Sequence, residues 1–226
     1  MLLNRLKGVF IDLDGTLIDS LQVYRKAYEE LFKKFGIVPD DRFYKNFGEG
    51  PVELANKIYS AYKDKLNISF EEFLKVRESI LDSLISEIKF TPGAKEVLIY
   101  LKDKGFKIGI VTSSSRSFTE KVLDNLGLKG FFDVVITSDD VKNLKPDPEP
   151  YILALNRLKL LPDECLAIED SIYGIISAKN AGINVIAVLT GANTKKEIKN
   201  LGVYKIMKNL KDLLKFFKDN LEVKDQ

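Results

Sequence analysis

The chain changes from an apolar run to acidic residues in one step, between residues 9–11 (Val-Phe-Ile) and residues 12–15 (Asp-Leu-Asp-Gly). A β-prone run of this kind is typical of a buried strand, and open α/β sheets carry their chemistry where such strands end. Because side chains alternate along a strand, Asp12 and Asp14 would point to the same side if the extended geometry continues. Two adjacent carboxylates need a cation between them or a proton on one of them. The pattern suits a Mg²⁺ site, and a solvated Asp-rich turn explains this pattern, taken alone, equally well.

Composition narrows the class of protein. The 226 residues are 45% hydrophobic and carry a net charge of +2. This length is enough for a well-buried core in one or two domains, and the charge predicts neither a nucleic-acid nor a membrane partner. No apolar run approaches a membrane span, and charge follows the first residues too soon for a signal peptide. We therefore expect a cytoplasmic protein, and the sequence does not indicate its oligomeric state.

The absence of histidine excludes several mechanisms. With no His in the chain, Ser-His and Cys-His nucleophile systems and His-ligated zinc are excluded. Cys165 is the single cysteine, so there is no intrachain disulfide and no cysteine cluster for a metal. The candidates for acid–base chemistry are therefore Asp, Glu, Lys and Tyr.

Periodicity divides the chain into two kinds of segment. Apolar residues recur at helical spacing over residues 21–35, 51–62 and 69–88, with a further short helix expected over 40–47. From residue 90 onward, short apolar strands alternate with helices, which predicts a parallel sheet covered on both faces. The predicted fold class is α/β, a Rossmann-like, doubly wound and mostly parallel sheet. We expect a core domain of residues 1–19 and 89–226, with a small α-helical domain of residues 20–88 inserted into it.

Three later segments would deliver polar groups to the same edge of the sheet. Thr112 and Ser113 end a strand and lead into a helix, where hydroxyls and backbone N–H groups suit an anion. Lys145 precedes a proline, which predicts an extended or turn segment. Glu169 and Asp170 follow another apolar strand, and carboxylates there suit a hard cation such as Mg²⁺. Each signal also has an ordinary structural explanation, such as helix capping or a surface lysine.

Taken together and in this order, the four segments resemble the signature of the haloacid dehalogenase superfamily of phosphohydrolases. The string Asp-Leu-Asp-Gly-Thr-Leu at residues 12–17 carries the first motif, and Thr112, Lys145-Pro146 and Glu169-Asp170 carry the others. The helical segment after the first motif is similar to the family's small helical cap, of the C1 type. The resemblance covers nearly the whole chain, and it is strongest to the phosphoglycolate phosphatase and β-phosphoglucomutase branches.

The resemblance implies a mechanism. Asp12 would be the nucleophile that forms an aspartyl-phosphate, and Asp14 would protonate the leaving group and then activate water, holding its proton because of neighbouring negative charge. Mg²⁺ would be bound by the Asp12 carboxylate, the Asp14 carbonyl and Asp170, with Glu169 bound directly or through water. The phosphoryl oxygens would be held by Lys145 and by the side chains or amides of residues at the first two motifs, namely Asp12, Leu13, Asp14, Thr112 and Ser113.

The resemblance thus predicts a Mg²⁺-dependent phosphatase for a small phosphorylated metabolite, and three alternatives stay open. True dehalogenases lack the second acid, so Asp14 counts against C–Cl cleavage. β-Phosphoglucomutases carry a His where this chain has Tyr24, which counts against a mutase. A non-catalytic binding module is disfavoured because the acids and Lys145 are intact. Substrate specificity is expected from five residues of the helical segment: Ser20, Tyr24, Lys45, Asn46 and Gly48.

Overall fold

The computed structural model describes residues 2–40, 51–191 and 193–221, and its centre is a parallel sheet. Six strands form the sheet in the order β5-β4-β1-β6-β7-β8, and all neighbouring pairs are parallel. In that order the strands are Val134–Ile136, Lys107–Val111, Gly8–Ile11, Cys165–Glu169, Asn184–Val188 and Lys205–Met207. Numbered along the chain, this is the 3-2-1-4-5-6 order of Rossmann folds. The predicted fold class is confirmed.

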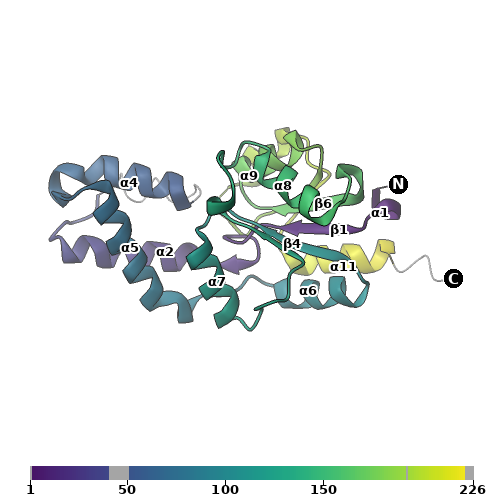
Figure 1. The fold of residues 1–226 in the computed structure, drawn as a ribbon, viewed down its shortest axis with the longest axis horizontal. Coiled ribbons are helices and arrows are strands. Elements are labelled where there is room, and N and C mark those ends of the chain that lie inside the picture. Colours follow the sequence, from purple (N-terminus) through teal and green to yellow (C-terminus); the bar gives the residue numbers. More distant parts are fainter. Residues whose placement is uncertain (1, 41–50, 192, 222–226) are drawn as a thin grey trace.

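Helices cover both faces of the sheet (Figure 1). One face packs against α6, α7 and α11 (Ala94–Asp103, Arg116–Asn125 and Leu210–Leu221), and the other against α8, α9 and the short α10 (Glu149–Leu158, Ile172–Asn180 and Lys195–Ile198). Val9 and Ile11 of β1 belong to the first apolar cluster and Phe10 to the second, as strand alternation requires. Because both faces are covered, β1 is buried throughout.

Three longer helices form the body that extends to the left in Figure 1. They are α2, α4 and α5 (Leu21–Lys34, Pro51–Leu66 and Phe70–Leu84), and they enclose an apolar cluster of their own. Ser69 caps α5 through a capping box with Glu72. The helix expected over 40–47 lies almost wholly outside the described residues, and the division at 20–88 stays a prediction.

Several short elements, including α10, were not predicted. A helix, α1 (Leu2–Arg5), precedes the first strand, and a two-residue antiparallel pair, β2 (Ile18–Asp19) with β3 (Lys89–Phe90), joins the two ends of the helical segment. Pairs this short carry no readable alternation, because a period of two needs about four residues to appear.

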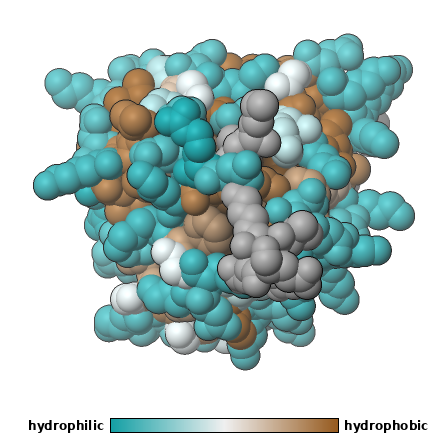
Figure 2. All heavy atoms as spheres, turned by 90° about the vertical axis from the view of Figure 1, so that its right-hand side faces the viewer, coloured by the Kyte–Doolittle hydropathy of each residue, from teal (hydrophilic) through white to brown (hydrophobic). Residues whose placement is uncertain are grey.

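The end of the molecule that carries α11 and the N-terminus is mostly hydrophilic, with smaller hydrophobic areas between the charged side chains (Figure 2). Among the described residues, no helix combines the length and the apolar character that crossing a membrane would need.

Candidate active site

The central strands β1 and β6 place the candidate residues. They are parallel neighbours, with Ile11 beside Ile168, and the strand order reverses between them. Open α/β sheets bind ligands at such a switch point, outside the carboxyl ends of the strands. Asp12 follows β1 directly, while Glu169 ends β6 and Asp170 follows it. The topology therefore brings together the acids that two distant motifs supply.

Strand β1 ends at Ile11 and turns follow at Leu13 and Gly15, so the extended geometry on which the predicted alternation of Asp12 and Asp14 depends does not continue. The Asp12 N–H still bonds the Ile168 carbonyl at 3.0 Å, but the backbone then turns, and the Gly15 N–H returns to the carbonyl of Ile18 at 2.9 Å. Gly15 has φ +81°, and a Cβ there would lie 2.4 Å from a carboxylate oxygen of Asp170. Glycine is thus required both for the turn and for space beside Asp170.

Lys145 is the cation at the centre of the site. Its buried Nζ donates to Asp12 Oδ1 at 2.7 Å, to Glu169 Oε1 at 2.6 Å and to the carbonyl of Val111 at 2.8 Å. Burial alone would lower the pKa of Lys145, but the Asp12 and Glu169 carboxylates outweigh it and raise that pKa above its ordinary value. Lys145 therefore stays charged and bridges the ends of β1, β4 and β6.

Three buried carboxylates cluster around this lysine. Ligand oxygens of Asp12, Glu169 and Asp170 lie within 4.8 Å of one another. Burial, followed by the charges of Asp12 and Glu169, raises the pKa of Asp170 well above its usual range. An all-oxygen set of this kind fits a hard divalent cation such as Mg²⁺, with Asp12 and Asp170 as the carboxylates that would hold it.

Asp14 is held by two hydroxyls. Ser20 donates to its Oδ1 at 2.7 Å and Ser114 to its Oδ2 at 2.6 Å. Burial raises the pKa of Asp14 to about 6, against the lowering effect of both hydrogen bonds, and the charge of Asp12 adds a smaller contribution. The sequence reasoning assigned the raised pKa to neighbouring charge, so its direction agrees and its main cause is corrected to burial.

Of the other predicted residues, four lie among the described residues and three lie outside them. Thr112 is buried at the end of β4, where its Oγ1 accepts the Ser114 N–H at 3.0 Å, and Tyr24 places its hydroxyl 3.4 Å from Ser114 Oγ. Leu13 and Ser113 lie in the two loops that carry Asp12 and Thr112. Lys45, Asn46 and Gly48 lie outside the described residues. The roles assigned to all these residues remain predictions.

Several groups at the site were missed by the sequence reasoning. The Tyr151 hydroxyl donates to Glu169 Oε1 at 2.5 Å, and Thr16 Oγ1 donates to Asp170 Oδ1 at 3.0 Å. A buried tyrosine on an otherwise aliphatic helix face needs a partner for its hydroxyl, and this was the available signal. Gly191 had no such signal, although a Cβ there would lie 1.6 Å from Asp170 Oδ2.

A model of the haloacid dehalogenase-like hydrolase family matches residues 9–188. The chain belongs to this family. The resemblance stated from the motifs is therefore confirmed, and the chain is identified as a hydrolase.

Individual relatives agree with this assignment. The chain is 31% identical over 205 residues to a phosphorylated carbohydrates phosphatase of Thermotoga maritima, covering 90% of this chain and 94% of that protein. It is 37% identical over 182 residues to a bifunctional riboflavin kinase/FMN phosphatase of Arabidopsis thaliana, covering 80% of this chain but only 48% of that protein. A crystal structure of a putative β-phosphoglucomutase from Thermotoga maritima superposes with a TM-score of 0.80 at 30% identity, covering 95% of this chain and all of that one.

Proposed function

We propose that this haloacid dehalogenase-like hydrolase is a Mg²⁺-dependent phosphatase that acts on small phosphomonoesters through an aspartyl-phosphate on Asp12. The arrangement around Asp12 carries the proposal. One oxygen of this carboxylate accepts from Lys145, its neighbours Glu169 and Asp170 form an oxygen cluster, and Asp14 two residues on has a pKa of about 6. A nucleophile, a cation site and a group able to exchange a proton near neutral pH are thus adjacent.

In the first half-reaction, a carboxylate oxygen of Asp12 attacks phosphorus and the bond to the leaving oxygen breaks. Protonated Asp14 gives its proton to that oxygen, so the alcohol departs neutral. Lys145, the Thr112 hydroxyl and the backbone amides near Leu13 and Ser113 hold the phosphoryl oxygens. Bound Mg²⁺ would offset repulsion between the anionic nucleophile and the anionic phosphate.

In the second half-reaction, ionised Asp14 takes a proton from water, and the resulting hydroxide attacks phosphorus and releases Asp12 together with phosphate. A single carboxyl can serve both steps because a pKa of about 6 leaves both of its protonation states accessible near neutral pH. Its two serine partners fix its orientation without removing this capacity.

A mutase is the second candidate, supported by the structural likeness to a putative β-phosphoglucomutase. Tyr24, which stands where those enzymes carry His, argues against it. Its hydroxyl faces Ser114, and burial raises its pKa well above the ordinary value, so it does not supply the proton exchange of a histidine. We therefore expect the leaving group to escape to solvent and the aspartyl-phosphate to be hydrolysed.

The test is an assay of the purified protein with Mg²⁺ on p-nitrophenyl phosphate and a panel of phosphorylated metabolites, with an EDTA control. Phosphate release should disappear in Asp12→Asn and persist in Asp163→Asn, which changes an exposed acid in a surface ion pair. β-Glucose 1-phosphate is scored for both isomerisation and hydrolysis. Metal-independent turnover, or full activity of Asp12→Asn, would refute the proposed mechanism, and isomerisation would favour the mutase.

A further inference from the structure

Thr16 connects the turn after β1 to the last acid of the carboxylate cluster. Its side chain is fully buried, and its hydroxyl donates to Asp170 Oδ1 at 3.0 Å. Asp170 follows β6, so this bond joins two segments that are far apart in the sequence. Carboxylates that bind a metal ion are commonly held by such neighbouring donors, and loss of the donor weakens metal binding.

The two oxygens of the Asp170 carboxylate have different surroundings. Thr16 bonds Oδ1, whereas a Cβ on Gly15 or Gly191 would lie 2.4 or 1.6 Å from Oδ2, so the glycines leave room for this oxygen. Among the residues that the structure describes, no N–H or O–H group donates to Oδ2. The bond to Thr16 thus fixes the carboxylate through one oxygen and leaves the other for a cation.

Two distant threonines hold the backbone that carries Thr16. The Thr190 hydroxyl, which follows β7, donates to the Gly15 carbonyl at 2.6 Å. The Thr91 hydroxyl, which follows β3, donates to the Thr16 carbonyl at 2.6 Å, and the Thr91 N–H donates to the Leu17 carbonyl at 3.0 Å. Three consecutive carbonyl groups are therefore bonded to other parts of the chain, and the turn presents the Thr16 hydroxyl from a rigid support.

We propose that Thr16 is a positioning residue for the cation, because its hydroxyl orients the Asp170 carboxylate so that this acid binds Mg²⁺ together with Asp12. The inference rests on the proposed phosphatase function, whose cation site it refines. Thr16 acts through Asp170 alone, so its loss should weaken binding of the metal ion and leave turnover at saturating metal nearly intact. A threonine that serves only the fold would instead affect stability and not metal affinity.

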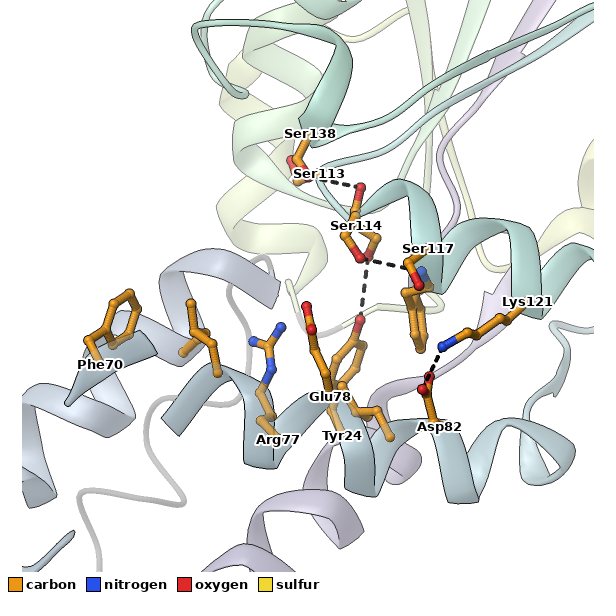
Figure 3. Close-up of a pocket in the computed structure, with 15 residues that line it drawn as sticks. Tyr24, Phe70, Arg77, Glu78, Asp82, Ser113, Ser114, Ser117, Lys121 and Ser138 are labelled. Atoms are coloured by element: carbon orange, nitrogen blue, oxygen red, sulfur yellow. Dashed lines mark hydrogen bonds and ion pairs between the residues drawn. The ribbon is translucent and has the colours of Figure 1, made fainter. Parts of the chain in front are cut away.

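This role is separate from the contacts between the helical segment and the core. Figure 3 shows one of them, the ion pair between Lys121 of α7 and Asp82 of α5. In the described part of the chain, neither of these side chains bonds Thr16 or Asp170. The cation site can therefore be perturbed without disturbing the way in which the helical segment packs against α7.

The experiment measures the dissociation constant of Mg²⁺ by calorimetric titration with MgCl₂ alone and from the rise of Tm with MgCl₂ concentration. Thr16→Val keeps the shape of the side chain but removes the hydroxyl, and it should raise this constant about tenfold or more, the usual cost of losing such a donor. Thr16→Ser, which keeps the hydroxyl, should bind nearly as the wild type. If Thr16→Val does not fold, Thr16→Ser and Thr16→Ala provide the same comparison, since they differ by the hydroxyl alone.

Two variants serve as matched controls. Thr137→Val removes the same kind of bond at the end of β5, where the hydroxyl of a buried threonine donates to Asp140 Oδ2 at 2.8 Å. Asp82→Asn breaks the ion pair with Lys121 that Figure 3 shows. Both variants should keep the Mg²⁺ affinity of the wild type, although Thr137→Val should lower Tm.

Kinetics give a second measurement on the same variants. Phosphate release by Thr16→Val should approach the wild-type kcat once the MgCl₂ concentration is raised in proportion to the weaker binding. Weaker Mg²⁺ binding in Thr16→Val, with recovery in Thr16→Ser, supports the assignment. It is overturned if Thr16→Val is less stable but binds Mg²⁺ as the wild type does, or if Thr137→Val weakens binding equally.

Failure of the proposed function would look different. If the wild type binds no Mg²⁺, or if Asp170→Asn binds it as tightly as the wild type, the proposed cation site is refuted together with the role of Thr16. Absence of phosphate release from every substrate, in a wild type that binds Mg²⁺, would refute the phosphatase function and leave the effect of Thr16 on metal binding measurable.

Discussion

Replacement of Ser114 by alanine tests the role of Asp14 as the acid. The Ser114 hydroxyl donates to Asp14 Oδ2 at 2.6 Å and stabilises the ionised carboxyl, so its loss should raise the pKa of Asp14 above about 6. A hydrogen bond to a charged group contributes about 1.5–3 kcal/mol, and one pKa unit corresponds to about 1.4 kcal/mol. Because water can replace part of the bond, we expect a rise of about one unit.

The assay is the pH dependence of kcat/KM. Protonated Asp14 is needed to expel a poor leaving group, so kcat/KM for glycerol phosphate should fall as pH rises through the pKa of Asp14. In Ser114→Ala the fall should occur about one pH unit higher, by the estimate above. The phosphate of the substrate also titrates near pH 6, but it does so equally for both proteins, and the difference between them reports Asp14.

Two comparisons make the result specific. p-Nitrophenol leaves readily without a proton, so the shift should be much smaller with p-nitrophenyl phosphate. Ser83→Ala, which removes an exposed hydroxyl bonded within α5, should behave as the wild type. An unchanged or lowered midpoint in Ser114→Ala, or the same shift with both substrates, would refute the assignment of Asp14 as the acid.

Three further predictions concern stability and reactivity. Tyr151→Phe removes one of the donors to buried Glu169, and it should lower the free energy of unfolding by about 1–3 kcal/mol in urea titrations. Burial would raise the pKa of Asp140, but hydrogen bonds from Thr137 and two arginines lower it to about 2. This carboxyl therefore stabilises the fold above its unfolded pKa of ~4, and the advantage of the wild type over Asp140→Asn, about 1–2 kcal/mol, should vanish as pH falls from ~4 to ~2. Burial raises the pKa of the Cys165 thiol to about 12, so a thiol reagent should modify it only in denaturant.

The fold was predictable because its signals are long or repeated. Apolar strands alternating with helices appear in the sequence, and they predict a parallel sheet that is covered on both faces. The β2–β3 pair was not predictable, since its stability comes from contacts such as the Thr91 N–H to the Leu17 carbonyl at 3.0 Å rather than from local pattern. The helix Leu2–Arg5 is likewise too short to show periodicity.

The site, like the fold, contains residues that the sequence could predict and residues that it could not. Four site residues could be predicted, because each follows a strand or a turn and carries the charge that the chemistry needs. They are Asp12, Lys145, Glu169 and Asp170. The hydrogen-bond partners of these residues could not be predicted. Ser114 is one of three consecutive serines, and the sequence does not indicate which of them bonds Asp14. Gly191 matters through a contact with Asp170 twenty-one residues away, and no local pattern reports such a contact.

We propose different roles for the two acids at the end of β6, Glu169 and Asp170, from the contacts that each of them makes. Glu169 Oε1 already accepts from Lys145 and Tyr151, and a Cβ on Gly174 would lie 1.9 Å from Oε2, so this carboxylate is enclosed by donors and backbone. Asp170 instead bonds Thr16 and lies against two glycines that leave it room. One lysine against the three carboxylates leaves an excess of two negative charges, which a divalent cation balances. Glu169 is therefore suited to anchor Lys145, whereas Asp170 and Asp12 are suited to hold the divalent cation.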